Sequence, residues 1–412
     1  MITLNGKYSN AKIMIDQVEP ECISQIVSMI NNPVFVNPVA IMPDCHAGKG
    51  SVIGFTMKRG DKIIPNIIGV DIGCGMLSMN IGKVEINFSE LDSSIRKRIP
   101  FGMNTHEKAI INMRKNFPFG EYSYEWFEKT CKRIGMDVSY AINSIGTLGG
   151  GNHFIEIGKS ISNNDIWITV HSGSRNFGKK VCDYWQKVAE GSDDQTKKLK
   201  MLIGLEEIKK TSKSGTEIGK RISELKQSLN IVKKVSGLEF LEGSDVDGYL
   251  EDMYFAQQYA EENRYMIMSQ ILIALKKFNA YSSIQTVHNF IDPQDQIIRK
   301  GSIRSYVNEI MLIPFNPFDG LLICEGKSNP EWNFSAPHGA GRVMSRGKAK
   351  KTITKEMADE AMKGVYASSR PLDESPLVYK NSALIEKFIE PTAKIIDRIK
   401  PIMNLKANDG DE

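Results

Sequence analysis

The order of apolar and polar residues along the first part of the chain predicts helices and strands in turn. Apolar residues recur at helical spacing over Glu19–Asn32, and extended apolar runs follow at Pro38–Pro43 and Ser51–Thr56. A second helical region is expected over Tyr124–Ile142, and a strand over His153–Ile157. These segments together are typical of an α/β or α+β protein with mixed β-sheets flanked by helices.

The rest of the chain continues this mixture. The strand expected at Ile166–Val170 ends at the polar turn His171–Arg175, and open α/β sheets place functional groups at such strand ends. A long helix is expected over Tyr249–Phe278. Short strands then alternate with loops, a glycine-rich turn covers Pro337–Arg342, and two helical stretches are expected to finish the chain. No internal repeat is present. Since single large α/β units of this length are common, we predict one domain over residues 1–412 that carries an insertion.

Residues 190–235 are expected to form a charged helical hairpin on the surface of that domain. The segment is rich in Lys, Ser, Glu and Gln, with Leu and Ile at helical spacing. Residues 197–234 contain eleven Lys or Arg and four Glu, a net charge of +7 against +4 for the whole chain. Clustered lysines give a salt-sensitive affinity for an RNA backbone. The simpler alternative is a solvated helical face whose lysines pair with its glutamates.

Composition narrows the class of protein. The 412 residues are 41% hydrophobic and 25% charged, which is typical of a soluble globular protein and not of a disordered one. No apolar run approaches the roughly 18 residues of a membrane helix, and the first residues do not resemble a secretory signal, so a cytoplasmic location is expected. The six cysteines form no Cys-x-x-Cys pair, which favours a role as thiolate over a disulfide framework.

The loop Gly69-Val-Asp71-Ile-Gly73-Cys74-Gly75 holds a carboxylate and a thiol three positions apart in a backbone that can bend tightly. Three histidines stand beside expected strands or glycine-rich turns, at His153, His171 and His288. Together these side chains offer one oxygen, one sulfur and three nitrogen donors, a set suited to Zn, Mn or Fe. A thiolate can also bridge two metal ions. The alternative, that Asp71 caps a turn and Cys74 is a small buried residue, is equally compatible with the spacing.

A second candidate for chemistry is the turn Pro337-His338-Gly-Ala-Gly-Arg342. Glycines beside a histidine clear space for a ligand and expose backbone N–H groups that can hold a phosphate. Arg342 and Arg346 add positive charge. Because imidazole is a competent nucleophile at phosphorus, a phosphorylated or nucleotidylated His338 is chemically sensible. The alternative is a purely structural turn.

Six motifs run through most of the chain. They are Met42-Pro-Asp-Cys-His-Ala-Gly-Lys-Gly50, Gly69-Val-Asp-Ile-Gly-Cys-Gly-Met76, Leu148-Gly-Gly-Gly-Asn-His-Phe-Ile-Glu156, Val170-His-Ser-Gly-Ser-Arg175, His288-Asn289 and Ser335-Ala-Pro-His-Gly-Ala-Gly-Arg342. Together they resemble one family, the RtcB-type RNA ligases, which join RNA ends in tRNA splicing and RNA repair. The match is collective, because the motifs occur in the family's order.

The resemblance implies a GTP- and Mn²⁺-dependent enzyme that joins an RNA 3′-phosphate or 2′,3′-cyclic phosphate to a 5′-hydroxyl. It implies that His338 carries GMP, and that two Mn²⁺ ions are held by Asp71, Cys74, His153, His171 and His288. The implied nucleotide site consists of Asn152, Phe154, Glu156, Asn289, Pro314, Asn316, Gly339, Ala340, Gly341, Tyr379 and Lys406. Candidate RNA or phosphate contacts are Arg175, Arg342 and Arg346. The implied partners are RNA ends and an archease-like activator, with no membrane.

The chemistry of guanine agrees with this assignment. Phe154 and Tyr379 could stack on a purine, and Glu156 could accept hydrogen bonds from guanine N1–H and N2–H, which adenine does not present in the same way. The alternative is that Glu156 faces solvent from a strand. The chain departs from the family pattern at Phe315–Gly320, where many members have a Gly-Ser-Met-Gly or an Asn-Met-Arg-Asp-Gly run. A basic side chain is replaced there by Phe318, so one family contact to nucleotide or RNA is not carried over.

Two other functions are compatible with parts of this pattern. One is a metal-dependent cyclic phosphoesterase that opens cyclic phosphates without ligation, and the other is a non-enzymatic protein that binds RNA ends. The turn around His338 and the terminal Lys406 argue against both, because neither function needs a nucleotidyl acceptor.

Overall fold

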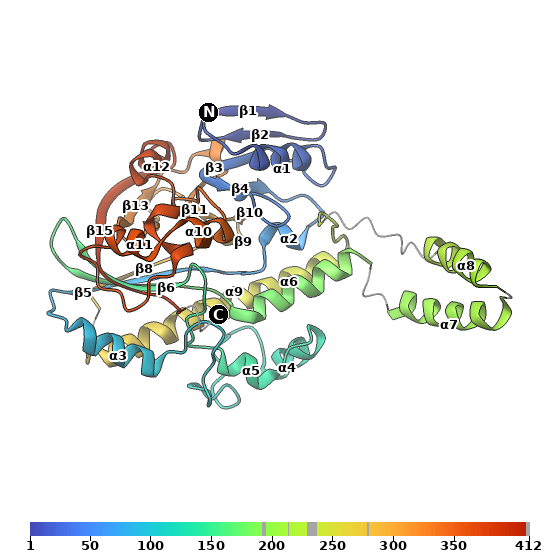
Figure 1. The fold of residues 1–412 in the computed structure, drawn as a ribbon, viewed down its shortest axis with the longest axis horizontal. Helices are drawn as coiled ribbons and strands as arrows, with labels where there is room; N and C mark the ends of the chain where they lie inside the picture. Colours follow the sequence, from blue (N-terminus) through green and yellow to red (C-terminus); the bar gives the residue numbers. More distant parts are fainter. Residues whose placement is uncertain (192–194, 213, 229–236, 278–279, 409–412) are drawn as a thin grey trace.

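The computed structural model describes residues 1–191, 195–212, 214–228, 237–277 and 280–408 (Figure 1). Two main β-sheets and a two-stranded ribbon are surrounded by helices, so the mixed α/β class predicted from the sequence is confirmed. In the part of the chain that is described, no helix is both long and apolar enough to cross a membrane.

The first sheet has six strands in the order β1-β2-β3-β4-β10-β9, antiparallel except for the parallel pair β2–β3. Helix α1 (Pro20–Ile30) makes the crossover between those two strands and buries Cys22, Ile26, Met29 and Ile30. The next helix along the chain, α2 (Pro65–Ile68), follows β4. The strands are β1 (Ile2–Asn5), β2 (Asn10–Ile13), β3 (Val39–His46), β4 (Ile53–Lys58), β9 (Asn289–Ile291) and β10 (Ile297–Lys300).

The second sheet has seven strands, all antiparallel, in the order β12-β13-β15-β6-β7-β5-β8. It curls so that its two edge strands approach each other, and the backbone N–H of Leu312 in β12 donates to the Thr286 hydroxyl of β8 at 3.0 Å. The strands are β5 (Gly75–Gly82), β6 (Phe154–Ser160), β7 (Ile166–Ser172), β8 (Ser282–Val287), β12 (Ile310–Asn316), β13 (Gly320–Gly326) and β15 (Ala393–Leu405).

Helices cover the sheets and set the positions of the strand ends. The longest, α9 (Ser244–Ala274), lies beside α6 (Arg175–Ala189) and packs against β5 and β7 (Figure 1). Apolar side chains of α9, including Ile267 and Ile271, share a core with those strands. The remaining helices of this part are α3 (Phe88–Arg98), α4 (Tyr124–Arg133), α5 (Val138–Asn143), α10 (Arg346–Thr352), α11 (Lys355–Ala361) and α12 (Ser382–Ile389), with short 3₁₀ turns at Pro330–Trp332, Leu372–Glu374 and Pro376–Val378.

Helices α7 (Gln195–Thr211) and α8 (Gly215–Ser228) are the described part of the segment for which the sequence predicts a charged hairpin. They pack against each other and extend away from the sheets (Figure 1). The close approach is made at Gly204, where a Cβ atom would lie 2.6 Å from the Leu225 side chain. Residues 192–194, 213 and 229–235 of the predicted 190–235 segment lie outside the described residues.

One expectation from the sequence is wrong. The chain does not finish in helices: after α12 comes the 13-residue strand β15, which pairs with both β13 and β6 in the middle of the second sheet. Its pairing with β6 shifts register next to Pro401, which interrupts the simple alternation that a strand shows. The strand that carries His171 pairs antiparallel on both sides, with β5 and with β6.

Candidate active site

The loop between α2 and β5 brings Asp71 and Cys74 together. Gly73 adopts a left-handed conformation with φ of 70°, and a Cβ atom there would lie 2.8 Å from the Cα of Gln257 in α9. Only glycine therefore lets the loop lie this close to the helix. The Cys74 N–H donates to the Asp71 carbonyl at 3.2 Å, which closes the turn and aims both side chains the same way.

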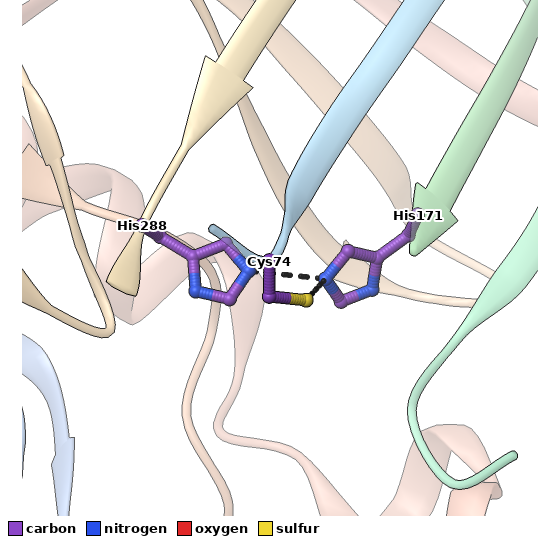
Figure 2. Close-up of side chains that lie close together, drawn as sticks. All are labelled: Cys74, His171 and His288. Atoms are coloured by element: carbon purple, nitrogen blue, oxygen red, sulfur yellow. Dashed lines mark hydrogen bonds between the residues drawn. The ribbon is translucent and has the colours of Figure 1, made fainter. Parts of the chain in front are cut away.

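The three histidines approach this loop from the second sheet. His153 precedes β6, His171 lies near the end of β7, and His288 lies between β8 and β9. The Cys74 Sγ is 3.4 Å from the His153 Nε2 atom. It is also 3.4 Å from His171 Nε2, which in turn is 3.1 Å from His288 Nε2 (Figure 2).

These five side chains form two groups of three with ligand atoms within 4.8 Å of one another. One group is Asp71, Cys74 and His153, and the other is Cys74, His171 and His288. Cys74 belongs to both groups. The arrangement is suited to two cations that share one thiolate.

Backbone carbonyl groups determine which ring nitrogens point into this cluster. His153 Nδ1 lies 3.0 Å from the Leu148 oxygen, and His171 Nδ1 lies 3.1 Å from the Asn152 oxygen. Because a carbonyl only accepts, both Nδ1 atoms carry the proton and each neutral ring presents an Nε2 lone pair. His153 Nε2 faces the Asp71 Oδ2 atom at 3.0 Å. With the ring neutral, a cation coordinated by both atoms satisfies this contact, so the residues fit a metal ion.

Burial controls the protonation of the cluster. It lowers the pKa of His171 and of His288 well below the ordinary value of histidine, which keeps both rings neutral, as metal ligands must be. Burial also raises the pKa of the Cys74 thiol well above its ordinary value. A cation that binds here must therefore displace a proton from sulfur, and its affinity falls as the pH is lowered.

His338 lies directly beside this cluster. It follows β14 (Ser335–Pro337), which pairs with β11 (Ser302–Arg304), and its ring centroid is 4.6 Å from that of His288. Its Nδ1 atom is 2.7 Å from Oδ2 of Asp44, a side chain of β3 with no exposed surface. Asp44 thus holds the Nδ1 proton and leaves the opposite Nε2 lone pair free to act as a nucleophile.

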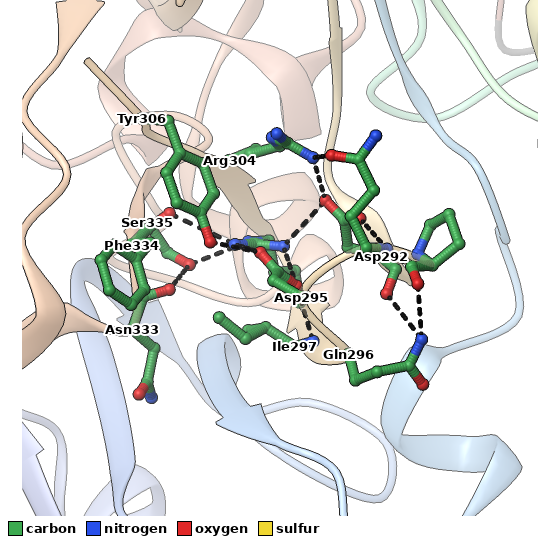
Figure 3. A network of polar contacts seen from close by, with 12 residues as sticks. Asp292, Asp295, Gln296, Ile297, Arg304, Tyr306, Asn333, Phe334 and Ser335 are labelled. Atoms are coloured by element: carbon green, nitrogen blue, oxygen red, sulfur yellow. Dashed lines mark hydrogen bonds and ion pairs between the residues drawn. The ribbon is translucent and has the colours of Figure 1, made fainter.

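A buried ion network joins the segment that carries His288 to the segment that carries His338 (Figure 3). Arg299 has no exposed surface; it pairs with Asp295 at 2.8 Å and donates to the Ser335 hydroxyl of β14 at 2.8 Å. Asp292, in the turn after β9, pairs with Arg304 of β11 at 2.7 Å. Because these charges are desolvated and mutually paired, they hold the two histidine-bearing segments in a fixed arrangement.

A cavity opens on the other side of His338. Phe154 and Glu156 share one face of the extended strand β6, and both line it. Glu156 is only 3% exposed, so the alternative that it faces solvent is wrong. Its carboxyl group accepts from the Asn404 amide at 2.9 Å, and burial raises its pKa to about 8. Lys406, at the end of β15, also lines the cavity.

Comparison with known proteins places this geometry in a family. A family model described as "tRNA-splicing ligase RtcB" matches residues 25–407. The chain belongs to the RtcB family. This assignment confirms the resemblance drawn from the sequence motifs.

Individual RtcB relatives match over most of both chains. The chain is 27% identical to the RNA-splicing ligase RtcB of Escherichia coli K12, over 94% of this chain and 95% of the relative. It is 24% identical to RNA-splicing ligase RtcB homolog 2 of Entamoeba dispar, over 93% and 83%. It is 22% identical to the tRNA-splicing ligase RtcB of Aeropyrum pernix, over 88% and 86%.

The structure brings most of the residues predicted from the RtcB resemblance into one place. Besides the candidate metal ligands, the residues of the predicted nucleotide and phosphate sites that line the cavity are Asn152, Phe154, Glu156, Pro314, Asn316, Gly339, Ala340, Gly341, Arg342, Arg346, Tyr379 and Lys406. Gly341 has φ of 73°, and a Cβ atom there would lie 2.1 Å from the backbone carbonyl oxygen of Asp44, so this turn requires glycine.

Two predicted residues are not among those lining the cavity. Asn289 bridges two backbone segments: its amide donates to the Asp71 oxygen at 3.1 Å and its side-chain oxygen accepts from Gly301 N–H at 2.9 Å. Arg175 donates to the Thr147 hydroxyl at 2.9 Å and to the Gly102 oxygen at 2.7 Å. In this conformation Asn289 supports the loop of the metal cluster from behind.

The loop that departs from the RtcB pattern turns between β12 and β13. The Asn316 side-chain oxygen accepts from the backbone N–H groups of Phe318 and Asp319, at 2.9 and 2.8 Å, which makes a compact turn. The Phe318 ring is 41% exposed, and Lys400 of β15 lies over it at 5.4 Å from the centroid. A cation therefore remains near the position that lost its basic side chain.

Sequence reasoning missed five residues that shape this RtcB site, although Asp44 and His46 stand in a motif that carried the resemblance. Arg264 of α9 has no exposed surface and donates to the carbonyls of Gly73 and Ser172, at 2.8 and 3.0 Å. It thereby links the residue before Cys74 to the residue after His171. The five are Asp44, His46, Arg264, Glu374 and Asn404.

Proposed function

We propose that this protein is a GTP- and Mn²⁺-dependent RNA ligase that joins an RNA 3′-phosphate or 2′,3′-cyclic phosphate to a 5′-hydroxyl through a guanylylated His338. One observation carries the proposal: His338 stands between a candidate two-metal cluster, 4.6 Å from the His288 ring, and a cavity that contains Glu156 and Lys406. The names of the relatives, RNA-splicing and tRNA-splicing ligase, support an RNA ligase.

The first step is attack by His338 on GTP. Because Asp44 accepts the Nδ1–H hydrogen bond, Nε2 has the free electron pair. A bond forms between Nε2 and the α-phosphorus while the bond from that phosphorus to the pyrophosphate oxygen breaks, and pyrophosphate leaves. The positive charge that develops on the ring is stabilised by the buried Asp44 carboxylate.

The following steps transfer the activated group to RNA. An oxygen of the RNA 3′-phosphate attacks the phosphorus on His338, which restores the free imidazole and leaves GMP joined to the RNA end. The 5′-hydroxyl of the second RNA then attacks the 3′-phosphate and releases GMP as the leaving group. A cyclic phosphate must first be opened by water to give the 3′-phosphate.

The metal ligands are Asp71, Cys74, His153, His171 and His288, and the Mn²⁺ assignment comes from the family resemblance. Bound there, Mn²⁺ supplies positive charge to phosphoryl oxygens and to the leaving pyrophosphate. The cavity residues select the nucleotide: Glu156 accepts from guanine, and Phe154 and Tyr379 offer rings for stacking.

A joining assay tests this function. Purified protein is incubated with GTP, Mn²⁺ and two RNA fragments, one ending in a 2′,3′-cyclic phosphate and the other beginning with a 5′-hydroxyl. We expect a joined product with GTP and none with ATP or with His338→Ala, and a parallel reaction includes an archease-like activator. Cyclic phosphate opening without joining would instead indicate the phosphoesterase, and RNA binding without any reaction would indicate the RNA-end binder.

A further inference from the structure

One buried carboxylate, that of Glu374, contacts four side chains that line the cavity. Its Oε2 atom accepts from the Tyr379 hydroxyl at 2.6 Å and from Lys406 Nζ at 3.0 Å. Its Oε1 atom lies 3.1 Å from Arg342 Nη1 and 2.9 Å from Arg346 Nη2. Glu374 is 3% exposed and is not itself among the residues that line this cavity, so it can act on a ligand only through its four partners.

The four partners gather around this one carboxylate in the wall of the cavity. Lys406 lies near the base-recognition residues, with its Nζ 5.4 Å from the centroid of the Phe154 ring and 3.5 Å from the Asn152 backbone oxygen. The Arg342 guanidinium lies over the Tyr379 ring, 5.5 Å from its centroid. A shift of the Glu374 carboxylate therefore displaces all four side chains at once.

The charges of this cluster do not allow the carboxylate to be removed without consequence. One carboxylate faces three cations, and the neighbouring Asp373 balances only Arg346, at 2.8 Å, and Lys350, at 3.9 Å. Without the Glu374 charge, the three cations repel one another and turn toward solvent. With it, the pocket keeps a net positive wall in a fixed geometry.

We infer that Glu374 is a positioning residue that holds Lys406, Tyr379, Arg342 and Arg346 in place in the wall of the nucleotide site. This inference rests on the proposed function, because it assigns the cavity to GTP. Glu374 stabilises bound GTP through these partners and takes no part in the making or breaking of bonds. Its loss therefore weakens GTP binding more than it slows guanylylation at saturating GTP.

The test compares Glu374→Gln with Asp373→Asn in a guanylylation assay. Asp373 and Glu374 are neighbours in the chain and both are buried, so each substitution removes one buried negative charge. Asp373 contacts neither Lys406 nor Tyr379. The loss of one charge-assisted hydrogen bond to a cation of the cavity should raise the KM for GTP on the order of tenfold. We expect Glu374→Gln to raise the KM for GTP by about tenfold or more and to change kcat by less than about threefold. Asp373→Asn removes only one such bond, that to Arg346, which keeps its bond to Glu374, so it should raise KM by at most about tenfold and by less than Glu374→Gln does.

Two further variants separate charge from fold. Glu374→Asp keeps the charge but is one methylene shorter, so its KM for GTP should lie between those of the wild type and Glu374→Gln. It replaces Glu374→Gln if that variant does not fold. Lys406→Met combined with Glu374→Gln should raise KM by less than the product of the two single effects. Melting temperature and Mn²⁺ binding are measured for every variant, because a merely structural role would lower both and leave KM unchanged in the folded fraction.

The outcomes distinguish this inference from the proposed function. If the wild-type protein takes no covalent label from GTP, the proposed function fails and the inference fails with it. If the wild type is labelled but Glu374→Gln has the same KM for GTP as Asp373→Asn, or if only kcat falls, the proposed function stands and the positioning role of Glu374 is wrong.

Discussion

Replacing Asp44 by asparagine tests how the structure prepares His338 for attack. The carboxylate of Asp44 accepts the His338 Nδ1–H hydrogen bond at 2.7 Å, and no part of Asp44 is exposed to solvent. Asparagine has nearly the same shape but no charge. Its amide can also donate to Nδ1, which would place the ring proton on Nε2 and remove the lone pair that attacks phosphorus.

The size of the effect follows from this contact. A hydrogen bond to a charged group contributes about 1.5–3 kcal/mol, and about 1.36 kcal/mol corresponds to tenfold in rate. We therefore expect the rate of GMP attachment to fall by about 10- to 150-fold, and further if the ring adopts the wrong tautomer. Mn²⁺ binding should stay close to the wild-type level, because Asp44 belongs to neither group of metal ligands.

A single-turnover assay with labelled GTP at saturating Mn²⁺ measures this rate. Asp165→Asn is the control, because the Asp165 carboxylate also accepts a hydrogen bond from a side-chain N–H, that of the Asn80 amide at 3.0 Å, but it lies at the far end of β7 from His171. It should react at the wild-type rate. If Asp44→Asn labels as fast as Asp165→Asn, with equal melting temperatures, Asp44 does not prepare His338 and the tautomer argument is wrong.

Three other substitutions probe the metal cluster and the cavity. Cys74→Ser should lose most bound Mn²⁺ in elemental analysis, whereas Cys45→Ser should keep it, because a hydroxyl is a poor bridging ligand. Arg264→Met leaves two backbone carbonyls unpaired at about 1–3 kcal/mol each, so both the melting temperature and Mn²⁺ content should fall. Glu156 has a pKa of about 8, so its guanine-accepting carboxylate is lost as the pH falls below that value. GTP affinity should therefore weaken by about tenfold between pH 8 and about pH 6.5, and Glu156→Gln should show no such dependence.

Each of these expectations has a contrary outcome. Equal Mn²⁺ content in Cys74→Ser and Cys45→Ser would remove Cys74 from the cluster. An Arg264→Met protein with wild-type stability and metal content would show that the two carbonyls need no partner. A pH dependence of GTP binding that persists in Glu156→Gln would assign the titration to another group.

The parts of the site that could be predicted from sequence are those that lie in short local motifs. Asp71 and Cys74 are three positions apart in a glycine-rich loop, and His338 is followed directly by glycine, so a few neighbouring residues specify each turn. The histidines are dispersed, but the strands that carry them have clear apolar patterns. Helix α1 and the strand β7 were predicted close to their observed bounds for the same reason.

The parts that could not be predicted depend on contacts between distant segments. The partner of His338 is Asp44, which lies in a strand 294 residues earlier in the chain. Glu374 stands in a polar stretch that resembles any surface turn, and only the fold buries it among three cations. The last strand, β15, does not read as a strand from its sequence, because Pro401 and the exposed pair Ile395 and Ile396 break its alternation, and pairing on both sides decides its conformation.

Covalent labelling shows whether His338 carries the nucleotide. Wild-type protein and His338→Ala are incubated with α-labelled GTP and Mn²⁺, denatured and digested, and the labelled peptide is identified by mass spectrometry. We predict GMP on the peptide that contains His338, and no label on His338→Ala, which still binds Mn²⁺. Label on a lysine, label retained in His338→Ala, or no label on the wild type would rule out His338 as the nucleotide carrier.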